Sequence, residues 1–205
     1  MLNQIYRIIR AKGEDVSYNK HSTQINLYDC CSEKDFNFHW TQKLIKDEDV
    51  YREYPKVKGK LFREFLKDDP KEEYGFERNP HITVLYGIQD EADYFDMRKK
   101  LKNFGPIDFK ISDISSFRDV ENPYDVIILK IESEKLHKVH EFLKETYEND
   151  WSYPKYNPHM TLAYVKKGKC LDIEGPCDWT GKSYKCPLIT FSHKDKYFLP
   201  IPLLL

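Results

Sequence analysis

The sequence predicts an α+β fold of two similar halves, in which two small, mainly antiparallel sheets face each other. Strand-like and helix-like segments follow one another in mixed order, which is typical of this class. The length of 205 residues, 40% of them apolar, suits one domain and would be cramped for two. The stretch NPHITVLYG at 79–87 recurs as NPHMTLAYV at 157–165. We therefore expect one bilobal domain spanning residues 1–205.

The first predicted elements lead up to the first copy of the motif. TQINLYD at 23–29 alternates like a strand, and LFREFLK at 61–67 has helical spacing. Prolines, a glycine and many charges at 68–80 indicate an exposed loop. HITVLYG at 81–87 is β-branched and apolar, and Gly87 closes it, so we expect a buried strand. Residues 30–78 are expected to form an inserted cap or an extension.

A helix and a hairpin are expected between the two copies. The helix covers 92–105, with Asp90 as N-cap and Gly105 as its stop. Strands at 107–117 and 125–131 flank an Asn-Pro turn and should pair as a hairpin.

The second copy has a similar setting. Ser133 can cap a helix that runs to about residue 148. The strand 159–165 follows, and two last strands are expected at 185–192 and 196–203. The helix should bury Leu136, Val139, Phe142 and Leu143 and expose His137 and His140 on its surface.

Charge and cysteine content exclude several classes of function. Lys and Arg number 33 against 34 Asp and Glu, so no excess positive charge is available to hold long nucleic acid. A nucleotide partner is therefore expected to be small. The five cysteines are odd in number and form no Cys-x-x-Cys pair, which argues against a disulfide framework or a zinc site. No apolar run approaches the ~20 residues of a membrane span, so we expect a cytosolic protein with no membrane partner.

The doubled motif places reactive side chains on one face of each strand. Because strand side chains alternate, His81 and Thr83 point to one side and the apolar residues between them to the other. The same holds for His159 and Thr161. Two such strands facing one site would present two imidazoles and two hydroxyls.

That set suits phosphoryl chemistry without a metal or other cofactor. One neutral imidazole can accept a proton from an attacking hydroxyl or water, while the other, protonated, donates to the leaving oxygen. The threonine hydroxyls can donate hydrogen bonds to the non-bridging phosphate oxygens. The pattern predicts catalytic roles for His81, Thr83, His159 and Thr161.

These residues resemble the 2H phosphoesterases, a family named for two His-x-Thr/Ser motifs on paired strands. The resemblance covers roughly residues 79–203 and extends more weakly to the strand at 23–29. It implies a two-lobed, pseudo-symmetric fold with a central cleft and helices outside, and metal-independent cleavage or ligation at nucleotide phosphates. HSTQINL followed by PHITVLYGI is similar to phage-type members, some of which destroy cyclic oligonucleotide defence signals. The resemblance thus implies a small cyclic oligonucleotide as the leading substrate. The family also includes enzymes for 2',3'-cyclic phosphates, 2',5'-oligoadenylates and RNA ends.

Aromatic residues in loops are the candidates for stacking on a nucleobase. WSYPKY precedes the second motif and forms either a substrate lid or a hydrophobic anchor for its loop. Alternation puts Tyr86 and Tyr164 on the apolar faces, which predicts core packing. Lys166 could attract phosphate. The stacking candidates are Trp40, Tyr124, Trp151, Tyr153 and Tyr156.

Two further observations limit the functional prediction. A third His-x-Thr, at His21 to Thr23, lacks the Asn-Pro entry, so we expect it to begin the first strand without a catalytic role. A non-catalytic nucleotide-binding module and a metal-dependent hydrolase stay open as alternatives. Because both His-x-Thr pairs are intact and no metal-ligand spacing is visible, catalysis without metal is favoured.

Overall fold

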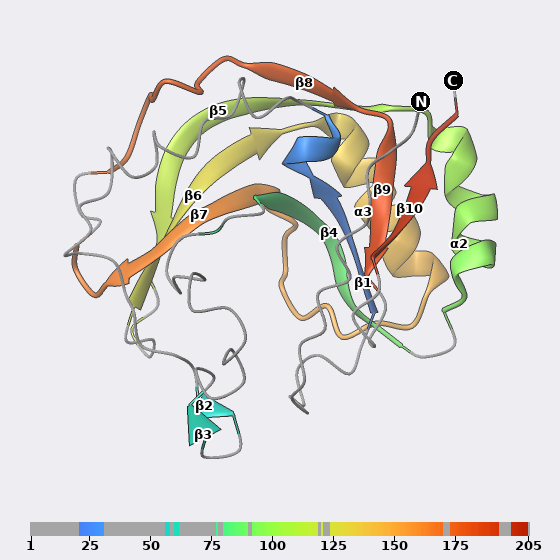
Figure 1. Cartoon of the computed structure of the whole chain (residues 1–205), viewed down its shortest axis with the longest axis horizontal. Coiled ribbons are helices and arrows are strands. Elements are labelled where there is room, and N and C mark those ends of the chain that lie inside the picture. Colours follow the sequence, from blue (N-terminus) through green and yellow to red (C-terminus); the bar gives the residue numbers. More distant parts are fainter. Residues whose placement is uncertain are drawn as a thin grey trace.

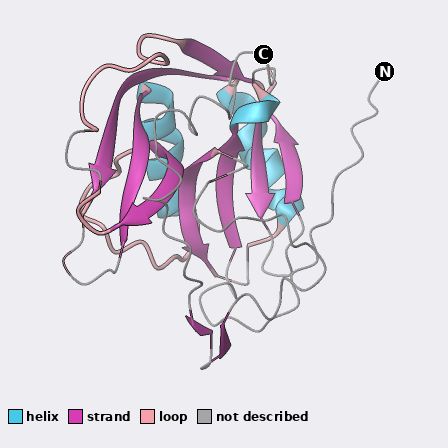
Figure 2. Ribbon diagram, turned by 60° about the vertical axis from the view of Figure 1, so that its left-hand side comes forward, coloured by secondary structure: helices cyan, strands magenta, loops and turns pink. Residues whose placement is uncertain are grey.

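The computed structural model is built on a strongly curved sheet that forms a half-barrel, with two helices on its convex side (Figure 1). A second view shows both helices lying behind the same face (Figure 2). Neither helix in the described part of the chain is long and apolar enough to cross a membrane. The structure describes residues 21–30, 56–57, 60–61, 77, 80–89, 92–118, 120, 124–169, 173–192 and 198–204.

All neighbouring strands of the sheet are antiparallel. In spatial order they are β10 (Phe198–Pro202), β9 (Leu188–Ser192), β1 (His21–Asn26), β4 (His81–Ile88), β7 (His159–Lys166), β6 (Tyr124–Glu132), β5 (Ile107–Phe117) and β8 (Ser183–Cys186). The other elements are the short pair β2 (Lys56–Val57) and β3 (Lys60–Leu61), the helices α2 (Tyr94–Leu101) and α3 (Glu134–Thr146), and the 3-10 turns Leu27–Asp29 and Lys102–Phe104.

The two motif strands are neighbours in this sheet, so the expectation of two separate sheets is wrong. β4 and β7 join at the centre through one residue pair, Ile82 opposite Met160. Beyond that pair the two strands run apart in opposite directions (Figure 1). The motif copies therefore pair with each other and do not face one another across a gap. The α+β class and the antiparallel pairing are confirmed.

The segment after α3 takes the place of β7 along the outer part of β4. Asn149 forms an isolated antiparallel bridge with Ile88, and the Asp150 amide donates to the Gly87 carbonyl at 3.1 Å. This segment satisfies backbone groups of β4 that β7 no longer reaches. It then leads directly into the second motif.

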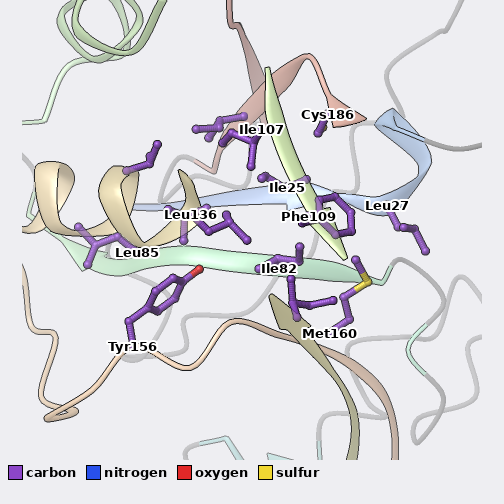
Figure 3. Packing of buried hydrophobic residues seen from close by; sticks show 14 of the residues in the cluster. Ile25, Leu27, Ile82, Leu85, Ile107, Phe109, Leu136, Tyr156, Met160 and Cys186 are labelled. Atoms are coloured by element: carbon purple, nitrogen blue, oxygen red, sulfur yellow. The ribbon is translucent and has the colours of Figure 1, made fainter. Parts of the chain in front are cut away.

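The core lies between the sheet and α3 (Figure 3). Leu136, Val139 and Leu143 of α3 are fully buried, as are Ile82 and Leu85 of β4. Each fully buried aliphatic side chain of this size contributes about 1.5–3 kcal/mol of transfer free energy. The helix face predicted from spacing is confirmed, and Phe142 packs at its half-buried edge.

Capping residues fix where the helices begin. The Ser133 hydroxyl accepts from the Leu136 amide at 3.1 Å, which confirms the predicted cap of α3. The cap of α2 is Asp93, whose carboxylate accepts from the Asp96 amide at 3.0 Å. The prediction of Asp90 was therefore wrong, because the chain before Tyr94 is already extended at Asp93.

The predicted strands hold with small shifts at their ends. The strand at 107–117 matches β5, and the hairpin with β6 is confirmed. Pro187 divides the strand expected at 185–192 into β8 and β9. β1 begins at His21 and turns into a 3-10 helix at Leu27.

Parts of three expectations fall outside the described residues. Leu61 belongs to the short strand β3, and the rest of the helix predicted at 61–67 is not described. The same applies to most of the loop at 68–80 and of the cap at 30–78.

Gly87 allows the segment after α3 to approach β4 closely. Its φ is +71°, and a Cβ there would lie 3.0 Å from Asp150 Cβ and 3.2 Å from the Asp150 amide nitrogen. We expect Gly87→Ala to destabilise the fold by about 1–2 kcal/mol from backbone conformation, with the clash in addition. The midpoint of thermal unfolding should fall by several degrees.

Gly181→Ala is the matched control for this variant. Gly181 also has a positive φ of +86°, but a Cβ there would meet nothing within 4 Å. The control should therefore lose less stability than Gly87→Ala. Equal losses in the two variants would show that the contact with Asp150 is unimportant.

Candidate active site

The antiparallel pair at the centre of the sheet brings the two motifs together. With Ile82 opposite Met160, the register sets His81 opposite Thr161 and His159 opposite Thr83. All four side chains are half-buried, whereas Ile82 and Met160 are fully buried. The four functional groups therefore share the concave face, away from the helices.

Polar side chains of β1 extend the site on one side. Asn26 lies opposite His81 and Gln24 opposite Thr83. The Gln24 amide donates to Asn26 Oδ1 at 2.6 Å, and Asn26 Nδ2 is 2.9 Å from both Asp29 Oδ2 and Thr190 Oγ1. This network fixes the two amides beside the first motif.

A lysine extends the site on the other side. Lys130 of β6 lies opposite His159 and is exposed, so its ammonium group shares the concave face with the imidazole. Asp113 of β5 lies opposite Lys130 in the next strand. The sequence prediction missed Lys130. In the sequence Lys130 is visible only as a single lysine within the apolar run DVIILKI. Its place beside His159 depends on the register between β6 and β7, which cannot be predicted from the sequence.

His159 is held in one tautomer by the entry to its own strand. Its Nδ1 lies 2.8 Å from the Asn157 carbonyl oxygen, which can only accept, so Nδ1 carries a proton. Nε2 is then the nitrogen that can accept a proton. The Phe117 ring meets the imidazole edge-on, with centroids 4.7 Å apart. Phe117 is a second residue that sequence reasoning missed.

Burial favours the neutral form of His159. It lowers the pKa of His159 below the ordinary value of 6.5, the Asn157 hydrogen bond opposes this shift, and the charge of His81 adds to it. At neutral pH His159 is thus a free base with its proton on Nδ1.

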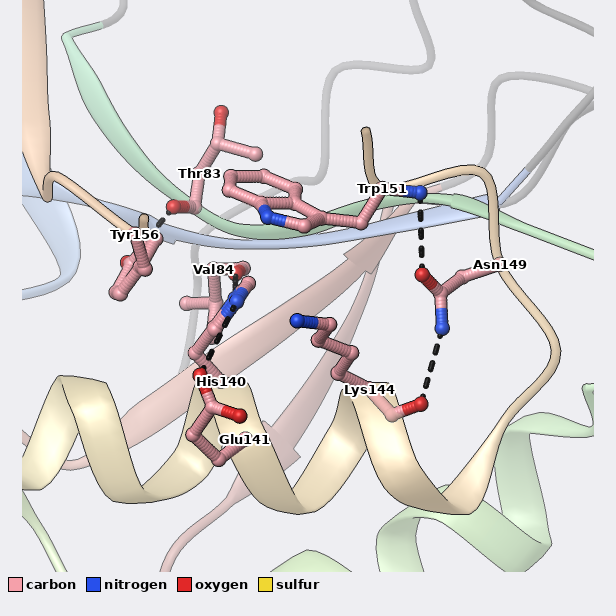
Figure 4. A network of polar contacts seen from close by, with 8 residues as sticks. All are labelled: Thr83, Val84, His140, Glu141, Lys144, Asn149, Trp151 and Tyr156. Atoms are coloured by element: carbon pink, nitrogen blue, oxygen red, sulfur yellow. Dashed lines mark hydrogen bonds and ion pairs between the residues drawn. The ribbon is translucent and has the colours of Figure 1, made fainter. Parts of the chain in front are cut away.

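A buried aromatic cluster holds the backbone of the first motif (Figure 4). The Tyr156 hydroxyl donates to the Thr83 carbonyl at 2.9 Å, and His140 Nδ1 donates to the Val84 carbonyl at 2.7 Å. The two rings stack in parallel with centroids 4.1 Å apart. His140 is 1% exposed, so the prediction that it lies on the helix surface was wrong. The His140 ring lies inside because it bonds the Val84 carbonyl of β4.

The residues proposed for stacking on a base have different environments. Tyr153 is 58% exposed, and Trp151 is half-buried against the core. Tyr156 is 5% exposed, which favours the anchor over the lid for this residue. Tyr124 is half-buried, and Trp40 lies outside the described residues.

Lys166, the residue predicted to attract phosphate, lies far from His159 along β7. It lies opposite Tyr124, seven residues beyond His159, which corresponds to ~23 Å at the rise of a strand. Lys130 is the cation next to the imidazole.

Tyr86 and Tyr164 do not pack in the core, so that prediction was wrong. Both are half-buried and lie outside the buried cluster, whereas Leu85 and Ala163 just before them are fully buried. In contrast, His21 and Thr23 face the core and are 1% and 0% exposed. The third His-x-Thr thus begins the first strand, as expected.

The described residues form a shallow hollow but no metal site. The hollow, of about 400 Å³, lies along β5 and β8, where Phe109 and Tyr184 help to line it, and none of the four motif residues lines it. Among the residues that the structure describes, no group of three or more His, Cys, Asp or Glu side chains could hold a metal ion.

Solved structures share the fold at low sequence identity. TT0787 of Thermus thermophilus superposes with a TM-score of 0.54 and 13% identity, over 89% of this chain and 94% of that one. Usb1 of Kluyveromyces marxianus superposes with a TM-score of 0.53 and 10% identity, over 92% of this chain and 100% of that one. E. coli LigT, complexed with 3'-AMP, superposes with a TM-score of 0.51 and 13% identity, over 91% of this chain and 98% of that one.

Sequence comparison identifies the family. A search of curated protein sequences finds no significant match. The family model described as the 2'-5' RNA ligase superfamily matches residues 62–174, which is more than half of the chain and contains both His-x-Thr motifs. The chain therefore belongs to the 2'-5' RNA ligase superfamily of 2H phosphoesterases.

Proposed function

We propose that this protein is a metal-independent phosphodiesterase that cleaves small nucleotide phosphodiesters by general acid/base catalysis at His81 and His159. The observation that carries the proposal is the antiparallel pair at Ile82 and Met160. It sets each histidine opposite the threonine of the other motif, so that one phosphate can contact all four groups.

His159 is proposed as the general base. Its Nδ1 proton is engaged by the Asn157 carbonyl, and partial burial of its ring lowers its pKa and favours the neutral state. Nε2 can then take the proton of a water or hydroxyl that attacks phosphorus. The Phe117 ring restricts the imidazole to this orientation.

His81 is proposed as the general acid, protonating the oxygen that leaves from the opposite side of phosphorus. Thr83 and Thr161 donate hydrogen bonds to the non-bridging oxygens. Lys130, opposite His159, supplies positive charge for the phosphate. The bond from phosphorus to the attacking oxygen forms as the bond to the leaving oxygen breaks.

Cyclic oligonucleotides are the substrate class that we propose first. The balanced charge of the chain suits a small substrate, and the resemblance of HSTQINL and PHITVLYGI to phage-type members points to cyclic signals of bacterial defence. Structures with the same fold bind uridine monophosphate and 3'-AMP. Joining of RNA ends is the second candidate, since the family is described by that activity.

Removal of either histidine tests the mechanism. We expect His81→Ala and His159→Ala each to lower kcat by about 10²–10⁴, because each removes one proton-transfer group. Turnover is followed chromatographically in EDTA with 2',3'-cyclic AMP, 2',5'-linked triadenylate and the 3',3'- and 2',3'-linked cyclic dinucleotides.

Lys138→Ala is the control for these variants, since Lys138 lies on α3 with its side chain 72% exposed and outside the site, and it should keep full activity. If the wild type binds one compound but leaves all of them intact, the protein captures nucleotides without turning them over. Loss of wild-type activity in EDTA would favour the metal-dependent alternative.

The pH dependence should show the role of His159. Because the pKa of His159 is lowered, this group stays deprotonated down to pH values below 6.5. We expect the acidic limb of log kcat/KM to lie below pH 6.5. An acidic limb above pH 6.5 would contradict a His159 base whose pKa is lowered.

Tyr156 is proposed as a positioning residue for Thr83. Tyr156→Phe leaves the Thr83 carbonyl without its donor, which should cost about 1–3 kcal/mol of stability. We also expect kcat to fall while KM changes little, because Thr83 acts on charge that develops in the transition state.

Tyr147→Phe is the control for Tyr156→Phe. It removes a hydroxyl that bonds Asp96 at 2.9 Å on the helix side of the molecule. Its stability should fall while kcat stays unchanged. If both variants keep the wild-type kcat, Tyr156 has a structural role alone.

A further inference from the structure

Each motif strand contains a one-residue bulge just after its His-x-Thr. On β4, Thr83 pairs with Gln24 and Leu85 pairs with Thr23, so Val84 is the extra residue. A bulge shifts the alternation of side chains by one position. Tyr86 consequently faces the same side as His81 and Thr83, although a regular strand would turn it toward the core.

The same shift occurs on β7. Thr161 pairs with Ile128 and Ala163 pairs with Ile127, so Leu162 is the extra residue. Tyr164 then shares the concave face with the motif. Its partner across the ladder is Val126, which in turn lies opposite Phe117.

Hydrogen bonds from outside the ladder hold both bulges. The Val84 carbonyl accepts from His140, and the Leu162 carbonyl accepts from the Glu77 amide at 2.9 Å. The two donors come from different elements, yet each satisfies the extra carbonyl of one bulge. The bulges are therefore fixed features of the site.

The first tyrosine belongs to an aromatic group at one end of the site. The Tyr86 ring centroid is 5.2 Å from that of Trp151 and 6.3 Å from that of Tyr153. Trp151 and Tyr153 also contact each other, at 5.4 Å. We call Tyr86, Trp151 and Tyr153 the first aromatic group.

The second tyrosine belongs to an aromatic group at the other end. The Tyr164 and Tyr124 rings meet edge to face with centroids 5.2 Å apart. Phe117, in the same cross-strand row as Tyr164, is 42% exposed and reaches the His159 ring. We call Tyr124, Tyr164 and Phe117 the second aromatic group.

The strand directions place the two groups on opposite sides of the histidines. Tyr86 lies four residues beyond Ile82, and Tyr164 lies four residues beyond Met160 on a strand of opposite direction. Each tyrosine is thus ~13 Å along its strand from the central pair. The sheet is strongly curved (Figure 1), so positions on the concave face at its two ends are tilted toward the centre.

We propose that the two aromatic groups hold the two nucleobases on either side of the scissile phosphate, so that the substrate is a phosphodiester between two nucleosides. This inference rests on the proposed phosphodiesterase activity and narrows its substrate class. A nucleoside 2',3'-cyclic phosphate has one base and would use one group. Cyclic dinucleotides and linear dinucleotides have a base on each side and would use both. Stacking on aromatic rings accepts any base, because every base has a π-face.

Diesters that lack one base test the proposal. The probes are 3',5'-linked and 2',5'-linked diadenosine monophosphate, cyclic di-AMP, and two truncated diesters in which an abasic riboside replaces one nucleoside, either on the 5' side or on the 3' side of the phosphate. kcat/KM is measured in EDTA with the full chain. The wild type should cleave at least one of the two-base diesters about tenfold or more faster than either truncated diester.

Variants of the two tyrosines should separate the two ends. Tyr86→Ala and Tyr164→Ala should each lower kcat/KM for the two-base diester by about tenfold or more. Each variant should affect only one truncated diester, and the two variants should affect different ones. Tyr86→Phe and Tyr164→Phe, which keep the ring, should stay within about twofold of wild type.

Further variants guard against a loss of folding. Phe95→Ala removes an aromatic ring that is 71% exposed on α2, far from the concave face, and should change nothing. If an alanine variant melts below the assay temperature, Tyr86→Leu or Tyr164→Leu replaces it, because leucine keeps bulk without a π-face.

The outcomes distinguish this inference from the proposed function. If His81→Ala and His159→Ala are inactive but the tyrosine variants cleave every diester like wild type, two-base recognition is wrong and the phosphodiesterase stands. Two-base recognition is also overturned if Phe variants lose as much as Ala variants, or if both tyrosine variants affect both truncated diesters equally. If the histidine variants stay active, or if wild type cleaves no diester, the proposed function itself fails.

Discussion

One residue pair, Ile82 opposite Met160, determines how the rest of the site is built. It fixes the register between the two motif strands, and this register sets each histidine against the threonine of the other copy. Because the strands part directly after it, β4 needs new partners for its outer carbonyls. The segment after α3 provides them, through Asn149, Asp150 and the Tyr156 hydroxyl.

Because β4 and β7 separate beyond the central pair, each of them is contacted by a segment that is distant from it in sequence. The chain that leads into the second motif lines the first motif strand, where Tyr156 and His140 hold the carbonyls of Thr83 and Val84. The chain that leads into the first motif contacts the second motif strand, where Glu77 bonds Leu162. Each half of the site therefore requires the other half for its geometry. The Asn-Pro entries instead bond beside the outer neighbour of their own strand: the Pro80 carbonyl accepts from the Leu27 amide just after β1, and the Pro158 carbonyl accepts from the Ile131 amide of β6.

The sequence was informative where a side chain's role depends on local spacing. Alternation identified His81 and His159 as residues on strands with one polar face, and the cap at Ser133 was readable from its own segment. The alternation of side chains predicted the wrong face for the tyrosine after each motif. VLY at 84–86 and LAY at 162–164 look like regular continuations of the strands, and the letters do not reveal the extra residue. The roles of Lys130 and Phe117 depend on which strand lies beside which, and that is decided by long-range pairing. His140 was misjudged because its burial results from the bulge carbonyl that it contacts.

The surroundings of the two histidines also bear on substrate polarity. The antiparallel pair makes the motif copies equivalent under a local twofold rotation, so His81, Thr83, His159 and Thr161 by themselves treat the 5' and 3' sides of a phosphodiester alike. The strands that flank them break this equivalence. β1 sets the uncharged amides Gln24 and Asn26 beside the first motif, whereas β6 sets Lys130 beside the second. We therefore expect the neighbouring strands, and not the repeated motif, to set the direction in which a nucleotide strand is accepted.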